Sequence, residues 1–288
     1  MTHKNHLMVW ASWASVGTAG ILIALKTFAF FMTGSVAVLA SLFDSIQDLM
    51  TSGINFITIH HSLQPADKKH RFGHGKAQGI GSFIQGLILL ISALWLAFES
   101  ALHIGRNEVP THSAWGMGII LTTLILTGLL IRFQAFVIRQ TDSLSIKADN
   151  AHYNGDLMMN FGVLISLVFS YAFAIGWTDS VFGLMVSLYL LKSGLYILRA
   201  AIAMLMDEEL PQHVQNKIKT QLNALKEIQE IQDLRTRLSG TQMFIQMTLV
   251  LDGQMPLAKA HLIADKAESL ICEIYPESEI MIHLEPKN

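Results

Sequence analysis

Long apolar runs dominate the first 206 residues of the chain. A membrane-spanning helix needs about 20 consecutive, predominantly apolar residues. Six runs meet this requirement: 8–31, 36–60, 77–102, 112–136, 144–173 and 180–204. The third run has no charged residue from Ala77 to Phe98, and the fourth has none from Val109 to Ile131. The pattern therefore predicts a bundle of six transmembrane helices.

The pattern changes beyond residue 206, where polar residues become frequent. Residues 243–251 alternate apolar and polar side chains, which indicates a strand with one buried face. Pro256 precedes a segment whose apolar residues recur at helical spacing. We also expect a short helix at 211–225, a weakly patterned strand at 228–239 and a last strand at "EIMIHL". The sequence thus predicts a membrane domain over 1–206 and a soluble α+β domain over 207–288.

Composition supports this division and excludes several classes of protein. Only 15% of the 288 residues are charged, against about 25% in soluble domains. Of the 42 charged side chains, 21 lie in the last 82 residues. The single cysteine, Cys272, allows no disulfide framework or thiolate metal cluster within one chain. The sequence has no basic stripe, so no nucleic-acid partner is expected.

The positions of basic residues predict the orientation in the membrane. The loop between the second and third spans contains Lys68, Lys69, Arg71 and Lys76, and the next loop on that side contains Arg139 and Lys147. The opposite connections offer little besides Arg106. Because basic loops remain in the cytoplasm, both termini should be cytoplasmic.

Two lysines fall inside the predicted spans. Lys26 lies near the outer end of the first span, where its ammonium group is expected to reach the interface by snorkelling. Lys192 lies nearer the middle of the sixth span, and the sequence offers no explanation for it.

Two acids interrupt the second span, which otherwise has no charged residue. Asp44 and Asp48 stand four residues apart, which places both carboxylates on one face of a helix, about 6 Å apart. Inserting each one into a membrane costs roughly 2.5–3.5 kcal/mol. Two anions at this spacing indicate a bound cation.

The fifth span supplies matching groups, His152 and Asp156, again four residues apart. Three carboxylates and one imidazole provide the four ligands of a tetrahedral site. Oxygen and nitrogen ligands without a thiolate favour Zn²⁺ or Fe²⁺ over Cu⁺. Because protons compete for the same groups, the set provides the minimum that a metal–proton antiporter needs.

Other interpretations of these residues were weighed. The acids could serve packing only, as we expect for Asp149 near the membrane edge, while Asn154 and Asn160 are expected to donate hydrogen bonds between helices. An intramembrane metallohydrolase would need an open ligand position and a general base, and the sequence has no HExxH motif. We therefore predict that the chain is not an enzyme. A metal sensor or a passive channel is a further alternative, and a channel would move metal at a rate indifferent to the pH gradient.

The loop after the second span holds a second candidate group. Asp67, His70 and His74 are spaced three and four residues apart. One carboxylate and two imidazoles suffice for an open zinc site. The spacing alone is equally compatible with a solvated basic loop, so both readings stay open.

Three motifs give the chain a family resemblance. "FDSIQD", "HRFGHGKAQ" and "HYNGDLMMN" occur in this order across the six spans, and the chain resembles the cation diffusion facilitators, specifically the bacterial ferrous-iron/zinc efflux branch. "QDLRTRLSG" and "AHLIAD" extend the resemblance into the tail. It implies a homodimer of the inner membrane that exports divalent metal by alternating access while protons move inward. No cofactor is implied beyond the transported Zn²⁺ or Fe²⁺.

The resemblance also assigns residues. The transport site of the family matches Asp44, Asp48, His152 and Asp156, its loop site matches Asp67, His70 and His74, and its interdomain charge pair matches Lys76 and Asp207. Asp44 distinguishes the chain from zinc-selective relatives with histidine there, and His152 distinguishes it from the manganese branch. We therefore expect Zn²⁺ and Fe²⁺ as substrates, with Cd²⁺ as a further candidate.

For the tail, the resemblance implies a ferredoxin-like, metallochaperone-type domain that holds two metals at the dimer interface. Here the match is incomplete, because Gln232 and Thr248 stand where the family pattern has histidines. His261, His283 and Glu285 remain and could form one site. Alternatively, these three are surface residues of a dimerisation domain.

Overall fold

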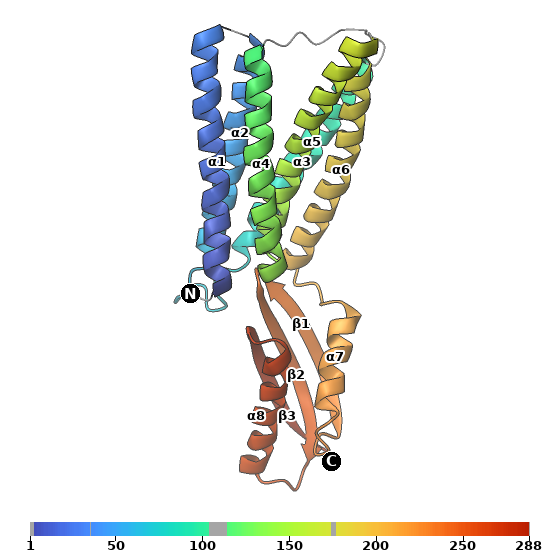
Figure 1. Ribbon diagram of the computed structural model, residues 1–288. Helices are drawn as coiled ribbons and strands as arrows, with labels where there is room; N and C mark the ends of the chain where they lie inside the picture. The colour runs from blue at the N-terminus through green and yellow to red at the C-terminus, as the bar shows by residue number, and fades with distance from the viewer. Residues whose placement is uncertain (1–2, 35, 104–113, 174–176, 288) are drawn as a thin grey trace. The chain divides into compact units, whose positions relative to one another are not determined.

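The computed structural model describes residues 3–34, 36–103, 114–173 and 177–287 (Figure 1). The chain divides into two compact units, Met1–Ile202 and Ala203–Asn288. Arg106 and the start of the fourth expected span, residues 112–113, lie outside the described residues.

Six long helices form the first unit: α1 (His3–Thr33), α2 (Val36–Ser62), α3 (Ala77–His103), α4 (Ala114–Thr141), α5 (Leu144–Phe173) and α6 (Thr178–Leu205). They contain 27 to 31 residues each, which corresponds to about 40–46 Å at 1.5 Å per residue. This length suffices to cross a bilayer. Among the described residues, α1, α3, α4 and α6 are also apolar enough to do so by composition alone. The remaining two, α2 and α5, carry the polar residues of the candidate site.

The helices pack in a defined order within this unit. In Figure 1, α1 lies beside α2 and α4, and α4 in turn contacts α5. One apolar cluster joins α1, α2, α4 and α5 through Met8, Ala11, Ile59, Val137 and Ile146. A second joins α3, α5 and α6 through Leu89, Ala93, Ala151, Val186 and Leu190. Because α2 and α5 also contact each other, their polar faces meet inside the bundle.

The second unit is an α+β domain of the ferredoxin-like class. Its elements are α7 (Gln212–Leu222), β1 (Glu230–Ser239), β2 (Gln242–Asp252), α8 (Leu257–Ile274) and β3 (Ser278–Lys287). The sheet has the order β1-β2-β3. β1 is antiparallel to β2, whereas β3 is parallel to β2, because α8 provides the crossover that a parallel pair requires.

The two tail helices and the sheet enclose one apolar core. Ile218 and Leu222 from α7, Ile245 and Leu249 from β2, and Ala267 and Ile271 from α8 are fully buried. This arrangement explains the alternation in residues 243–251, since every second side chain points toward the helices. The strand at 228–239 was weakly patterned because a register shift falls between Gln232 and Arg235, next to Asp233, whose φ is 48°.

Candidate metal-transport site

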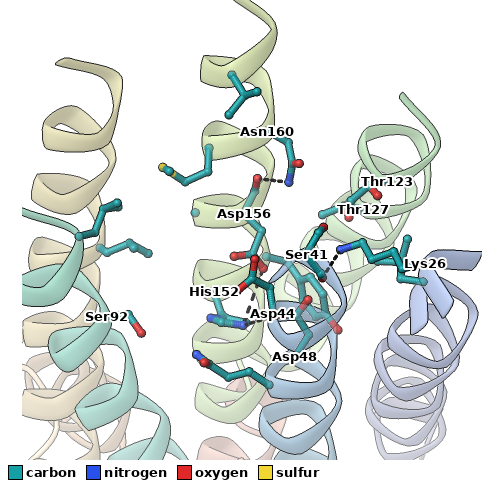
Figure 2. A pocket seen from close by; sticks show the side chains of 18 residues that line it. Lys26, Ser41, Asp44, Asp48, Ser92, Thr123, Thr127, His152, Asp156 and Asn160 are labelled. Carbon is teal, nitrogen blue, oxygen red and sulfur yellow. Dashed lines mark hydrogen bonds and ion pairs between the residues drawn. The ribbon is translucent and has the colours of Figure 1, made fainter. Parts of the chain in front are cut away.

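Acidic and imidazole groups from α2 and α5 meet inside the bundle (Figure 2). The Nε2 atom of His152 lies 3.1 Å from Oδ1 of Asp48 and 3.7 Å from Oδ2 of Asp156. One candidate ligand atom from each of these three residues lies within 4.8 Å of the other two. The helical spacing within α5 and the contact between α2 and α5 thus place three metal-ligating groups around one point.

One carboxylate oxygen of Asp156 has no hydrogen-bond donor among the described residues, although it lies within ion-pair distance of His152. This atom, Oδ2, is buried. Buried carboxylate oxygens are normally satisfied by hydrogen bonds or by a cation. Asn160 donates to the backbone oxygen of Asp156 at 2.8 Å, which leaves the carboxylate available. The group is therefore suited to hold a proton or a metal ion.

A cavity of about 360 Å³ opens beside these groups. All six helices contribute to its lining, which includes Thr123 and Thr127 of α4 and Ser92 of α3 (Figure 2). Asp44 also lines the cavity, but it is exposed and is not part of the group whose ligand atoms lie within 4.8 Å of one another. The structure thus brings three of the four expected ligands together and places the fourth on the wall of the same cavity.

Lys26 also belongs to this cavity, so the expectation that it snorkels outward was wrong. Only 6% of the residue is exposed, and its Nζ atom donates to the backbone oxygen of Ser41 at 3.0 Å and to Oγ of Ser45 at 2.7 Å. The sequence does contain a sign of this position. Lys26 continues the helical spacing of Ser15, Ala19 and Leu22, which form the buried face of α1. Lys192, in contrast, is exposed on α6.

Asp149 forms a second buried polar group, one helical turn from His152. Its Oδ2 accepts hydrogen bonds from Ser15 Oγ at 2.6 Å and from Gln134 Nε2 at 2.7 Å. The hydroxyl of Tyr153 lies 2.9 Å from Oγ of Ser52 and donates to the backbone oxygen of Ser15 at 3.3 Å. These bonds connect α5 with α1, α2 and α4. Asp149 is thus structural, as expected, but it lies in the interior and not at an interface.

Among the described residues, Asn154 and Asn160 of α5 form no hydrogen bond to another helix, so this prediction was wrong. Asn154 donates to the backbone oxygen of Asn150 at 2.8 Å, and Asn160 bonds within the same helix. Both amides point back along their own helix, since a side chain in a helix leans over the preceding turn.

The loop residues Asp67, His70 and His74 also come together, with ligand atoms that lie within 4.8 Å of one another. Nε2 of His74 is 3.1 Å from Nδ1 of His70 and 3.4 Å from Oδ2 of Asp67. His74 is buried, whereas the other two are exposed. Gly73, with a φ of 77°, provides the left-handed turn that returns the chain toward His70. The geometry fits an open site reachable from solvent.

Backbone hydrogen bonds fix the carboxylate of this loop. Oδ1 of Asp67 accepts from the backbone N–H of His70 at 2.6 Å and from that of Lys69 at 2.8 Å. These bonds stabilise the charged form, the one to His70 most strongly, and lower the pKa of Asp67 to about 2. Asp67 is therefore ionised at any physiological pH.

The tail candidates are more scattered. His283 and Glu285 lie two residues apart on β3, so they share one face of the sheet. His283 pairs in register with Thr248, which pairs with Gln232. His261 lies on α8, with Nε2 3.8 Å from Oδ1 of Asp265. Among the described residues, His261, His283 and Glu285 do not form a group with metal-binding distances.

The expected charge pair joins residues of different units. Lys76 belongs to the first unit and Asp207 to the second. Within the second unit, Oδ1 of Asp207 accepts from Nη1 of Arg237 at 3.1 Å. The pair between Lys76 and Asp207 therefore stays a prediction.

A helical bundle that gathers carboxylates and an imidazole around an internal cavity is characteristic of membrane transport proteins for cations. Family models identify which class this is: residues 12–206 match the cation efflux transmembrane domain, and residues 210–287 match the cation efflux protein, cytoplasmic domain. The chain belongs to the cation efflux family.

Two curated cation-efflux pumps agree with this assignment over nearly the whole chain. The cation-efflux pump FieF of Klebsiella pneumoniae is 38% identical over 99% of this chain and 94% of its own length. FieF of Salmonella choleraesuis is 37% identical over 98% and 94%. A solved structure of CzrB in a Zn form is 31% identical over 28% of this chain and 93% of its own, with a TM-score of 0.27. The chain is accordingly a multi-pass cation efflux transporter and not an enzyme.

Proposed function

We propose that the chain exports Zn²⁺ and Fe²⁺ from the cytoplasm in exchange for protons, with Cd²⁺ as a further candidate substrate. It acts as a homodimer in the inner membrane and moves its cargo by alternating access. The observation that carries this proposal is the buried Oδ2 of Asp156, which accepts no hydrogen bond from the described residues and lies beside Asp48 and His152.

The donor set supports the choice of metal. Asp48, Asp156 and Asp44 provide oxygen and His152 provides nitrogen, a combination that suits borderline divalent ions such as Zn²⁺ and Fe²⁺. Asp44 stands one helical turn from Asp48 on α2 and lines the same cavity. In this proposal its carboxylate is the fourth ligand of the ion.

Exchange with protons follows from the same groups. Carboxylates and imidazole bind metal only when deprotonated, so protons that reach the site from outside expel the metal. After release, protonation satisfies the buried oxygens until the site faces the cytoplasm again. Because a metal ion and protons cannot occupy the site at the same time, the flux of metal is coupled to the flux of protons.

The proposed orientation places both termini in the cytoplasm. It rests on the basic residues of the loops that follow α2 and α4, because basic loops remain cytoplasmic. In this orientation the cluster of Asp67, His70 and His74 faces the metal supply. We assign it as a loop site that takes up metal before transport.

The two predicted domains have separate tasks in this proposal. Residues 1–206 transport the metal, and residues 207–288 hold two protomers together. The tail site of His261, His283 and Glu285 stays a prediction; within the described part of one protomer these residues form no group with metal-binding distances.

Flux measurements in proteoliposomes test the proposal. Uptake of Zn²⁺ and Fe²⁺ should accelerate with an opposing proton gradient and slow when the gradient is collapsed. Asp48→Ala should abolish transport, whereas Asp179→Ala, an exposed acid outside the cavity, should not. Transport indifferent to the gradient would indicate a channel, and full activity of Asp48→Ala would refute the site.

A further inference from the structure

Lys26 places a positive charge in the wall of the transport cavity. The side chain extends from α1 toward α2 (Figure 2), where the two hydrogen bonds to Ser41 and Ser45 hold its ammonium group. Ser45 is the sequence neighbour of Asp44. The ammonium group is thus held against α2, inside the bundle.

Besides Lys26, the lining of the cavity includes three carboxylates and one imidazole. Of the 18 residues that line it, Asp44, Asp48 and Asp156 carry carboxylates, His152 carries an imidazole, and Lys26 is the one Lys or Arg. Lys26 therefore offsets part of the negative charge of the empty site, which would otherwise hold three acids within a low-dielectric bundle.

The same charge acts in the opposite direction once a metal ion is present. A dication in the cavity attracts the carboxylates but repels the ammonium group, and the burial of Lys26 reduces the screening of this repulsion by water. The hydrogen bonds to α2 prevent Lys26 from retreating to the membrane surface without losing both partners. Metal binding must therefore overcome a repulsion that the protein itself supplies.

We propose that Lys26 is a built-in competing cation that weakens the hold of the site on the metal ion and thereby speeds its release. This inference rests on the proposed transport function. A transporter needs a site strong enough to load but weak enough to unload. Four ligands around a divalent ion would bind it tightly, so a fixed opposing charge favours turnover at the expense of affinity.

A purely structural role makes the opposite prediction. If Lys26 served only to join α1 to α2, its removal would loosen the site and weaken metal binding. The competing-cation role predicts tighter binding after the charge is removed. The sign of the change in affinity therefore separates the two roles.

The test uses the full-length protein in nanodiscs, in a His70→Ala/His74→Ala background that lacks the loop site. Zn²⁺ titrations by calorimetry compare Lys26→Met, which removes the charge, with Lys26→Arg, which keeps it. We expect Lys26→Met to bind Zn²⁺ at least about tenfold more tightly and Lys26→Arg to stay within about twofold of the background. Lys192→Met, which removes an exposed membrane lysine outside the cavity, should change nothing.

Transport kinetics provide the second readout. In proteoliposomes, Lys26→Met should lower both KM and the maximal rate, because the metal loads more easily and leaves more slowly. If the methionine variant does not fold, Lys26→Gln removes the charge while keeping a hydrogen-bond donor and should give the same result. Unchanged or weaker Zn²⁺ binding by a folded, uncharged variant would overturn the inference.

Asp48→Ala in the same background distinguishes this failure from failure of the proposed function. If this variant keeps its Zn²⁺ binding, the transport site itself is wrong. If it loses binding while the uncharged Lys26 variants bind as the background does, the site stands and only the role of Lys26 is refuted.

Discussion

The distances around His152 are close to those that a bound ion would impose. Two ligand atoms of a tetrahedral Zn²⁺ ion lie about 3.3 Å apart when each bond is about 2.0–2.1 Å long. In the structure, His152 Nε2 lies 3.1 Å from Asp48 Oδ1 and 3.7 Å from Asp156 Oδ2. The two distances to His152 therefore differ from this value by only a few tenths of an ångström.

A separate prediction concerns the contribution of Asp149 to the stability of the bundle. Asp149→Ala leaves the donors of Ser15 and Gln134 without their buried acceptor, and it should destabilise the bundle by about 2–3 kcal/mol. Asp149→Asn keeps one acceptor oxygen and should destabilise it less. Equilibrium unfolding in mixed micelles measures both. An alanine variant as stable as the wild type would show that the hydrogen bonds around Asp149 contribute little.

The pH response of the loop follows from Asp67. Its pKa in the folded protein is lowered to about 2, from about 4 in an unfolded chain. The stabilisation is therefore fully present above pH 4 and is lost as the pH falls toward 2. We expect NMR of the Asp67 carboxyl carbon to show no titration between pH 7 and pH 4. A midpoint near 4 would contradict the observed hydrogen bonds to His70 and Lys69.

Among the elements, α3 and α6 pack through glycine. A Cβ atom at Gly86 would lie 3.2 Å from the backbone nitrogen of Leu198, which is too close for a larger side chain. Gly86→Val should push the helices apart and cost about 1–3 kcal/mol of stability. Gly128→Val on α4, where nothing lies within 4 Å, is the matched control. Thermal unfolding in detergent should separate the two variants, and equal effects would argue against close packing of α3 on α6.

Elements with an uninterrupted period were predictable from the sequence. The long apolar runs predicted the membrane helices, and the alternation of residues 243–251 predicted β2, because burial on one side imposes the period directly. β1 was harder to recognise. Its register shift near Asp233 moves the following side chains to the other face, so no single period describes the strand.

Side-chain direction was the part that sequence could not supply. The spacing within each pair, Asp44 with Asp48 and His152 with Asp156, predicted a shared helix face, since i and i+4 positions are neighbours on a helix. Lys26 and Asp149 were misplaced because their surroundings depend on which neighbouring helix covers them. That information lies in long-range packing and not in the local pattern.

At the scale of the whole molecule, the chain consists of two units with separate cores. The tail core includes Ile218, Ile245 and Ile271, all fully buried, and it draws only on residues beyond 210. We therefore expect a fragment of residues 203–288 to fold alone and unfold cooperatively in urea. Ile271→Ala should destabilise it by about 2–5 kcal/mol, while Glu273→Ala on the exposed side should have little effect. Circular dichroism measures both, and a fragment without a cooperative transition would contradict the prediction.

The Oδ2 atom of Asp156, which accepts no hydrogen bond from the described residues, has a consequence for how the proposed exchange uses the proton gradient. If the site reoriented with neither a metal ion nor a proton bound, a charged carboxylate would have to move through the bundle, which burial makes unfavourable. Reorientation of the empty site should therefore be rare, and the number of protons exchanged per metal ion should stay nearly constant. In the proposed exchange, protons should accordingly not flow through the protein when no metal ion is present.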